Sequence, residues 1–316
     1  MESVEAKEEN VTRKPAGEVS RLRLALLLVA LLGGNAALAL GAWFVRLADT
    51  GPVAAGFWRL ALAVPFLLLL ARVNGQAVLS IGPKRIAIVV LAGLFFAADV
   101  AAWHIGIGMT RLGNAVLFAN SGSIILMAWG FLSVGLFPKR SEWLAMASAV
   151  AGAGLLMGRS LEISQNTFYG DLLSLLAGMF YAGYLLILHD ARRTVGGWSI
   201  LFWTGLAGAP ALLALSLSFG EVIWPTDWTA IVLLVVVSQL LGQGLFVYAL
   251  GHFPPLIIGL SLLTQPAIAA MAGYFAFGEV LSALDVVGML LLGSALVVAR
   301  VAQFNGATVT PAKAGV

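Results

Sequence analysis

The chain has 316 residues, of which 60% are hydrophobic and 10% are charged, with a formal net charge of +3 and no cysteine. A soluble globular chain carries roughly 25% charged residues, so this composition excludes a water-soluble domain. The lack of cysteine excludes disulfides, thiol nucleophiles and thiolate metal sites.

Ten apolar segments follow a polar start. Residues 1–20 are rich in Glu and are expected to form a disordered N-terminal tail. A bilayer-spanning helix needs about 20 mostly apolar residues, and segments of that kind follow one another along the chain. The first is too long, and followed by too many others, to be a cleaved signal. The segments lie near residues 22–45, 52–72, 85–108, 112–136, 142–159, 170–190, 197–218, 228–250, 254–277 and 281–302. We therefore predict an all-α integral membrane protein with ten transmembrane helices.

The positive charges predict the orientation of these helices. Of the 18 Lys and Arg residues, fourteen fall on one side if the N-terminus is inside, and Arg59 lies within a segment. Only Arg46, Arg111 and Arg159 fall in the opposite loops. Short cytoplasmic loops carry the excess of Lys and Arg. Both termini are therefore expected to be cytoplasmic.

An internal repeat relates the two halves. Residues 56–70 realign on residues 201–215 at an offset of 145, so that Trp58 meets Trp203 and Pro65 meets Pro210. Five helices per half is an odd number, so the second half must enter the membrane from the opposite side, as in an inverted repeat. The predicted organisation is a first repeat at 21–160, a linker at 161–169, a second repeat at 170–303 and a cytoplasmic tail at 304–316.

Several motifs resemble those of one transporter superfamily. They are Trp58-Arg59 in the second segment, Gln265-Pro266 in the ninth, and Phe277-Gly278-Glu279 between the ninth and tenth. With these motifs the chain resembles the drug/metabolite transporter superfamily in its ten-helix EamA branch, which includes exporters of aromatic amino acids. The link between the fourth and fifth segments, Phe137-Pro138-Lys139-Arg140, departs from the Gly-Glu pattern.

The resemblance implies a function and a location. It implies a secondary transporter of the bacterial inner membrane that exports small metabolites, with amino acids as the first expectation. The solute site would lie between the two inverted repeats, and alternating access would open it to each side in turn. A broad drug exporter or a metabolite importer of the same fold stays open as an alternative.

Two ionisable residues lie deep within predicted helices, where they are costly and mark candidate functional sites. Arg59 lies about 10 Å and Asp99 about 12 Å from the outer ends of their segments, at 1.5 Å per residue. We predict that they interact directly or through water, either as a static ion pair or in coupling and substrate contact. His104, near the outer end, is either an interfacial residue or a relay for protons.

Neutral polar and aromatic residues suggest a shared cavity. Such side chains in a membrane helix face the interior, where they bond one another or line a cavity. The candidates for substrate binding are Asn35, Trp103, Asn120, Ser121, Tyr181, Tyr184, Gln243 and Gln265. Pro65, Pro210 and Pro266 are expected to bend their helices, as hinges or as symmetric packing kinks.

Other chemistries lack a pattern in the sequence. No zinc spacing, HExxH motif or Gly-rich phosphate loop occurs, so we expect no catalytic residues, metal or cofactor. The expected partners are a small-molecule solute, membrane lipids and, as a coupling ion, protons. We expect no nucleic acid, and either a monomer or a homodimer. A non-transporting membrane scaffold is the remaining alternative, and it predicts that the central polar residues only bond one another.

Overall fold

A computed structural model describes residues 21–78, 82–122, 140–188, 195–250, 261–262 and 264–309, and every regular element in these ranges is a helix. The helices are α1 (Arg21–Leu47), α2 (Pro52–Val73), α3 (Pro83–Met109), α4 (Leu112–Ala119), α6 (Arg140–Ile163), α7 (Gln165–Leu188), α8 (Gly197–Ser218), α9 (Thr229–Leu233), η2 (Leu234–Gly242), α10 (Gln243–Leu250), α12 (Thr264–Phe277) and α13 (Ala283–Val309). Seven helical stretches in the described ranges are long and apolar enough to cross a membrane. The all-α membrane fold is confirmed.

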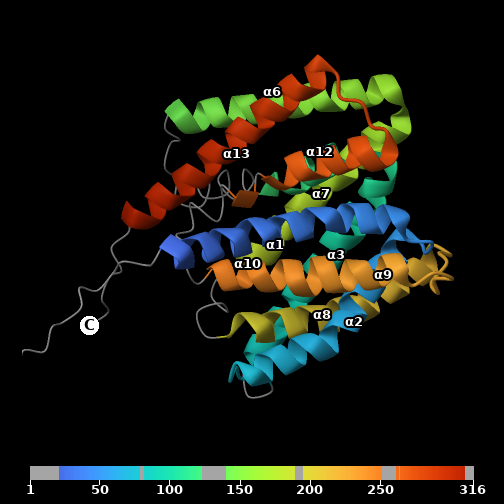
Figure 1. Ribbon diagram of the computed structural model, residues 1–316, viewed down its shortest axis with the longest axis vertical. Helices are drawn as coiled ribbons and strands as arrows, with labels where there is room; N and C mark the ends of the chain where they lie inside the picture. The colour runs from blue at the N-terminus through green and yellow to red at the C-terminus, as the bar shows by residue number, and fades with distance from the viewer. Residues whose placement is uncertain are drawn as a thin grey trace, which may run out of the picture.

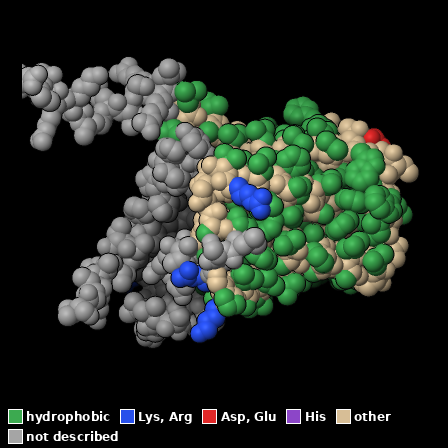
Figure 2. Space-filling model, turned by 90° about the horizontal axis from the view of Figure 1, so that it is seen from below, with side chains coloured by type: hydrophobic (Ala, Val, Ile, Leu, Met, Phe, Trp, Pro, Cys, Tyr) green, Lys and Arg blue, Asp and Glu red, His purple; other side chains and the backbone are tan. Residues whose placement is uncertain are grey.

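The helices lie side by side in one bundle (Figure 1). α6 and α13 pack together at one edge, α2 and α8 at the other, and α3 packs against α7 between them. Figure 2 shows that the described surface on one face is mostly apolar, with Lys and Arg gathered at one side of the molecule. Following the predicted orientation, we call the end that holds Arg46 and Thr110 the outer end, and the opposite one the inner end.

The predicted linker at 161–169 is almost entirely helical. α6 runs to Ile163 and α7 begins at Gln165, so that only Ser164 separates them. The Ser164 hydroxyl accepts a hydrogen bond from the Thr167 backbone N–H at 3.0 Å. This bond satisfies one of the free N–H groups at the start of α7, so a single residue is enough to end one helix and begin the next. The predicted tail at 304–316 also begins in helix, because α13 continues to Val309.

The predicted eighth segment is one continuous helical stretch with a change of pitch. Residues 234–242 form the π-helix η2 between α9 and α10. η2 packs against α1, where a Cβ added to Gly41 would meet the Ser238 side chain. π-helical turns inside longer helices often mark functional sites. η2 carries Gln239, whose role is described below.

The outer end of α2 is held by the segment that follows α8. Trp58 in α2 donates its indole N–H to the Ile223 carbonyl at 2.7 Å. The Glu221 carboxylate accepts the backbone N–H of Ala54 at 2.8 Å, in the first turn of α2. These two contacts form the outer clasp. A carboxylate suits this position because the first N–H groups of a helix have no partner within the helix.

The inner end of α8 is held in the same way by the segment that follows α2. Trp203 in α8 donates its indole N–H to the Val78 carbonyl at 2.9 Å. The Gln76 side-chain oxygen accepts the backbone N–H of Ser199 at 3.1 Å, in the first turn of α8. We call these two contacts the inner clasp.

The two clasps are copies of each other at opposite ends of the bundle. Each residue of one clasp lies 145 positions from its counterpart: Ala54 and Ser199, Trp58 and Trp203, Gln76 and Glu221, Val78 and Ile223. Gly75 and Gly220, also 145 apart, turn the chain out of α2 and α8 with φ of 65° and 67°. Because the related contacts lie at opposite ends, the two halves are inverted copies, and the predicted repeat is confirmed at the level of side-chain contacts.

Candidate functional site

Arg59 is buried between the two repeats. Its side chain is 5% exposed, and α2 holds it toward η2 and α3. The Nε group donates to the Gln239 side-chain oxygen at 2.9 Å, which joins the first repeat to the second. Nη1 lies 3.5 Å from His104 Nε2. Both of these partners are uncharged side chains when the imidazole is neutral, so neither cancels the charge of the guanidinium.

His104 is a buried residue of α3 and not an interfacial one. It is fully buried, and its Nδ1 lies 3.0 Å from the Pro52 carbonyl oxygen. A carbonyl only accepts, so Nδ1 carries the hydrogen and Nε2 is the acceptor that faces Arg59. A second proton would place a donor and a positive charge against the guanidinium. The geometry therefore favours a neutral His104 that orients Arg59.

Asp99 lies near Arg59 without forming an ion pair. Each side chain lies within reach of the other's charge. Among the described residues, however, Asp99 forms no ion pair within 4.0 Å and accepts no hydrogen bond. The side chain is half-buried in α3, at a depth of about 15 Å from Met109. Of the two predicted forms of this interaction, direct or through water, the direct ion pair is absent among the described residues.

Aromatic side chains lie beside Arg59 and in the α3–α7 interface. The Trp103 ring lies 5.8 Å from the Arg59 guanidinium carbon, and its indole N–H is buried without an acceptor among the described residues. Tyr181 and Tyr184 of α7 stack at 5.7 Å, and Tyr184 lies 5.2 Å from Phe96 of α3. α3 and α7 pack along their length, so these rings belong to the same interface as Asp99.

Asn35 and Gln265 form a separate, closed cluster. Asn35 is fully buried in α1 and donates to the Ser261 hydroxyl at 3.0 Å and to the Leu31 carbonyl at 2.9 Å. Gln265 in α12 donates to the Asn35 side-chain oxygen at 2.9 Å. These residues bond one another across the two repeats, which matches the role of holding helices together.

The remaining polar candidates lie at helix ends. Asn120 follows α4 and donates back to the Val116 carbonyl at 2.9 Å. Ser121 is buried, and its hydroxyl has no partner among the described residues. Gln243 is half-buried at the start of α10. The structure does not bring these three residues into contact with the charged pair.

All three prolines lie in helices. Pro65 and Pro210 lie inside α2 and α8, 145 residues apart, as predicted from the repeat. Pro266 lies near the start of α12 as the structure describes it, and residues 261–262 before it are also helical. The expected bend at Pro266 involves residue 263 as well, which lies outside the described residues.

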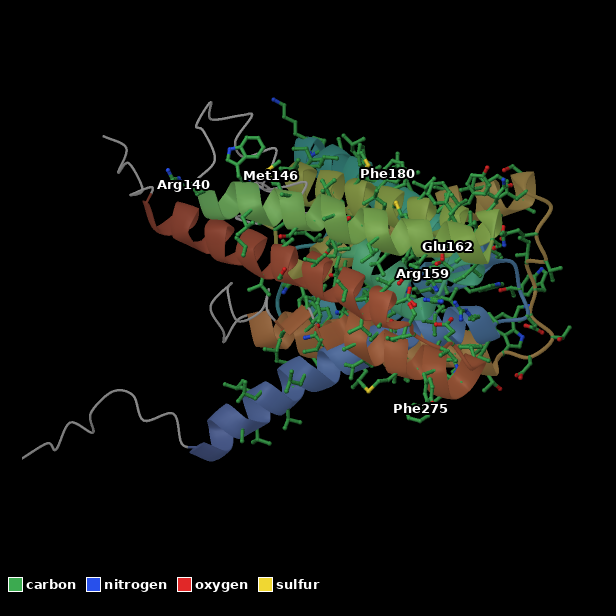
Figure 3. The ribbon with its side chains drawn as sticks, turned by 90° about the horizontal axis from the view of Figure 1, so that it is seen from above. Arg140, Met146, Arg159, Glu162, Phe180 and Phe275 are labelled. Atoms are coloured by element: carbon green, nitrogen blue, oxygen red, sulfur yellow. The ribbon has the colours of Figure 1, made fainter. Side chains whose placement is uncertain are left out.

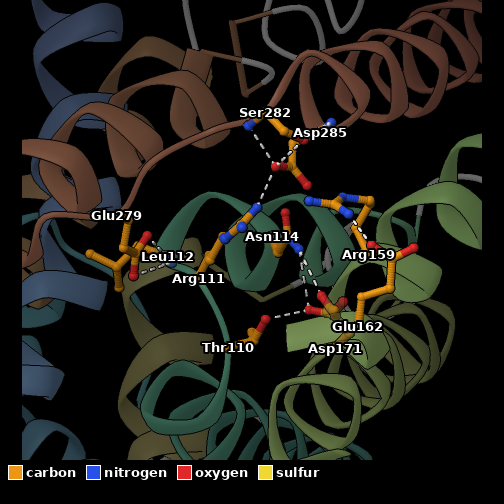
Figure 4. Close-up of polar contacts among 11 residues, drawn as sticks. Thr110, Arg111, Leu112, Asn114, Arg159, Glu162, Asp171, Glu279, Ser282 and Asp285 are labelled. Atoms are coloured by element: carbon orange, nitrogen blue, oxygen red, sulfur yellow. Dashed lines mark hydrogen bonds and ion pairs between the residues drawn. The ribbon is translucent and has the colours of Figure 1, made fainter. Parts of the chain in front are cut away.

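Arg46 and Glu279 join both repeats at the outer end. Arg46 at the end of α1 pairs with Glu279 at 2.5 Å and donates to the carbonyls of Ile107 and Thr110 at 2.7 and 2.5 Å. Glu279 also accepts the Leu112 backbone N–H at 3.0 Å, in the first turn of α4 (Figure 4). We call this group of contacts the outer latch.

A second group of polar residues lies beside the outer latch (Figure 4). Thr110 donates to Asp171 of α7 at 2.5 Å, and Asn114 of α4 donates to the same oxygen at 3.5 Å. Arg111 pairs with the buried Asp285 of α13 at 2.6 Å. Figure 3 places Arg159 and Glu162 at this end of α6 and Arg140 at the other, so the helix crosses from one end of the bundle to the other. The outer end is thus tied together from α1, α3, α4, α7 and α13.

Comparison with protein families identifies the second half. Residues 168–301 match the EamA-like transporter family. This range contains α8 and η2, which the clasps and the Arg59–Gln239 bond join to the first half. The second half of the chain is thus similar to the EamA-like transporter family.

Several proteins similar to this chain are named as transporters. The chain is 28% identical over 196 residues to the threonine/homoserine exporter RhtA of Escherichia coli, covering 60% of this chain and 63% of RhtA, which is less than two thirds of that protein. It is 26% identical over 196 residues to an uncharacterized transporter of Archaeoglobus fulgidus, covering 61% of this chain and 70% of the relative. The transporter YwfM of Bacillus subtilis, also uncharacterized, is 26% identical over 210 residues, 65% of this chain and 67% of YwfM.

A solved crystal structure has the same fold. It superposes with a TM-score of 0.59 at 15% sequence identity, covering 88% of this chain and 97% of the other. At this identity the likeness concerns the fold alone. The shared fold therefore includes both halves, although the family match is confined to the second.

Sequence reasoning did not find the partners that hold the site in place. Gln239 is the direct partner of Arg59, and the sequence marks it only as one of several polar residues within an apolar segment. Glu279 was singled out only as part of a family motif. Its pairing with Arg46 required knowing that the ends of α1 and α12 meet. Asp171 lies near the start of a predicted helix, where an acidic residue is common and carries no special signal.

Proposed function

We propose that this transporter exports amino acids across the bacterial inner membrane by alternating access, through a site between its two repeats. The observation that carries the proposal is the pair of opposite charges, Arg59 and Asp99, held apart within the bundle. Unpaired charges in a membrane-spanning region are costly and persist at sites of function. A static lock between α2 and α3 would instead bring the two side chains into direct contact.

Two observations bear on the alternatives. The Asn35–Gln265 cluster fits the scaffold alternative, because its members bond one another. Asp99 does not fit it, because the half-buried carboxylate bonds no described residue. The similarity to RhtA supports amino acids over drugs as the transported class, and the aromatic side chains near Asp99 support a role for large solutes. A substrate panel must therefore hold both threonine and aromatic amino acids.

The test is transport in proteoliposomes that contain the full chain. Labelled threonine, homoserine, phenylalanine and tryptophan are loaded inside and their efflux is measured, with protein-free liposomes as the control. We expect efflux of at least one of them to exceed the control. Efflux equal to the control for all of them, from protein that is folded and correctly inserted, would contradict the proposal.

A pH gradient across the same liposomes tests proton coupling. We propose Asp99 as the coupling carboxylate, because His104 is held between Pro52 and Arg59. Efflux that follows the gradient in the wild type and loses this dependence in Asp99→Asn supports coupling. Efflux that ignores the gradient supports facilitated diffusion, and the transport proposal then stands without the proton.

A further inference from the structure

The charges of Arg59 and Asp99 lack a counter-charge at contact distance. Arg59 bonds Gln239 at 2.9 Å and faces the neutral Nε2 of His104 at 3.5 Å. No carboxylate lies within 4.0 Å of Arg59 among the described residues, and the Asp99 carboxylate likewise lacks a cation. Arg59 lies against His104 of α3, five residues beyond Asp99 in the same helix. The two charges are therefore farther apart than an ion pair but near enough to act on each other.

The neighbours of Arg59 keep it in this position. Gln239 holds Nε from η2, and His104 lies against Nη1 from α3. His104 is itself fixed by the Pro52 carbonyl at 3.0 Å. Nη2 forms no hydrogen bond with a described residue and stays available. The guanidinium is thus oriented by neutral groups that leave its charge and part of its donor edge unused, an arrangement suited to an incoming anion.

We propose that Arg59 and Asp99 together bind the two charged groups of a zwitterionic α-amino acid. Arg59 takes the α-carboxylate and Asp99 takes the α-ammonium. The inference rests on the proposed function and names the residues that recognise the backbone of its substrate. In an α-amino acid both groups are attached to one carbon, so one molecule can satisfy two protein charges that do not reach each other. A solute with only one of the charges leaves the other protein charge buried and unpaired, which is unfavourable.

The Trp103 indole and the α3–α7 interface complete the site. The Trp103 ring lies 5.8 Å from the Arg59 guanidinium carbon, and its N–H is a second donor without an acceptor among the described residues. In α3, Phe96 precedes Asp99 by three residues and contacts Tyr184 of α7, whereas Trp103 follows Asp99 by four residues. The substrate side chain would lie along these rings, while Arg59 and Asp99 bind the α-carboxylate and α-ammonium groups that all amino acids share.

The first arm of the test uses the wild-type full chain and pairs of competitors that differ in one charge. Against labelled threonine, the competitors are threonine, 1-amino-2-propanol without the carboxylate, and 3-hydroxybutyrate without the ammonium. Against labelled phenylalanine, they are phenylalanine, phenethylamine and 3-phenylpropionate. We expect each amino acid to compete at least about tenfold better than either analogue, since a charged hydrogen-bonded pair is lost with each deletion. If an analogue with only one charge competes as well as its amino acid, the proposal is contradicted by the wild-type protein alone.

The second arm assigns each charge to its residue. Asp99→Asn should lower the preference for the amino acid over the analogue without an ammonium by about tenfold, and Arg59→Gln should do the same for the analogue without a carboxylate. The matched controls are Asp227→Asn and Arg72→Gln, because both residues are exposed and lie at the ends of the bundle. Both controls should keep the wild-type preferences.

The outcomes separate this inference from the proposed function. If the wild type moves no amino acid, the proposed function fails. If it moves amino acids while folded Asp99→Asn keeps the wild-type preference for the ammonium, transport stands and the zwitterion site is wrong. If either variant fails to fold, the competitor series on the wild type still decides whether both charges of the solute are read.

Discussion

At the scale of single residues, a neutral His104 is placed to orient the Arg59 guanidinium. Its two ring nitrogens face the Pro52 carbonyl and the Arg59 guanidinium, and the ring is fully buried. His104→Phe keeps a ring of similar size and removes both contacts. The substitution should destabilise the protein by about 1–3 kcal/mol, because a buried carbonyl and an N–H lose their partner. A thermal unfolding scan in detergent measures the effect, and an unchanged Tm would show that neither contact contributes.

Asp49 gives a pH dependence at the outer end. Hydrogen bonds from the Thr226 hydroxyl and from the backbone N–H of Asp227 lower the pKa of its carboxyl below the usual 3.8. A folded-state pKa below the unfolded one stabilises the contact above pH 3.8, and this stabilisation is lost as the pH falls through the lowered pKa.

Hydrogen exchange of the Thr226 and Asp227 amides tests this contact. Corrected for intrinsic exchange rates, protection should be greater in the wild type than in Asp49→Asn at neutral pH. The difference should shrink as the pH falls below the usual aspartate range. A difference that stays constant down to acid pH would mean that the carboxylate charge does not hold the loop.

At the scale of elements, the paired clasps provide an experiment within the chain itself. The outer clasp caps α2 with the Glu221 carboxylate, and the inner clasp caps α8 with the Gln76 amide. Because the Gln76 amide is sufficient to cap α8, a glutamine at position 221 should also be able to cap α2. Glu221→Gln should therefore leave the free energy of unfolding nearly unchanged. Glu221→Ala should cost about 0.5–2 kcal/mol, the usual cost of losing a helix cap.

The comparison needs a control for general effects of substitution. Gly158→Ala in α6 is suitable, because an added Cβ at that position meets no atom within 4 Å. It should leave the Tm unchanged or raise it slightly. If Glu221→Gln lowers the Tm as much as Glu221→Ala, the charge of the carboxylate, and not its hydrogen bond, holds the clasp.

At the scale of the whole molecule, the outer latch ties the two repeats together at the outer end. Glu279 holds Arg46 of α1 and the first turn of α4 together. In the proposed transport cycle these contacts must break for release. Glu279→Gln removes the charge from the latch, so it should favour the outward-open state by about tenfold, the equivalent of one charged hydrogen bond.

A single introduced cysteine can report this opening, because the natural chain has none. Ala115 is fully buried in α4, one turn inward from Leu112. A membrane-impermeant thiol reagent added outside should label Ala115→Cys slowly, and label it faster when Glu279→Gln is also present. Equal labelling rates in the two proteins would show that the latch does not control access.

The sequence predicts much of this architecture because the bilayer imposes simple rules. Helix lengths follow from the apolar thickness, and the Trp58–Trp203 and Pro65–Pro210 matches are enough to find the repeat. The contacts between individual side chains are harder to predict from the sequence. Depth along the helices predicts that Arg59 and Asp99 lie at similar levels of the bundle, but it does not fix the rotation of either helix. Gln239 therefore occupies the position expected of Asp99. The π-helical pitch of η2 has no marker in its residues and depends on packing against α1.

The clasps also constrain how the chain is assembled during synthesis. Trp58 lies near the start of the second helix, yet its acceptor, the Ile223 carbonyl, is made 165 residues later. Conversely, the residues that cap α8 are already in the membrane when Ser199 is made. The first half is therefore inserted before the outer clasp of α2 can form. The inner clasp of α8, in contrast, can form as soon as α8 is made, because Gln76 and Val78 are already present. Ribosomal stalling between residues 79 and 195 would leave a nascent chain in which neither clasp can close, because Ser199, Trp203 and Ile223 are not yet made.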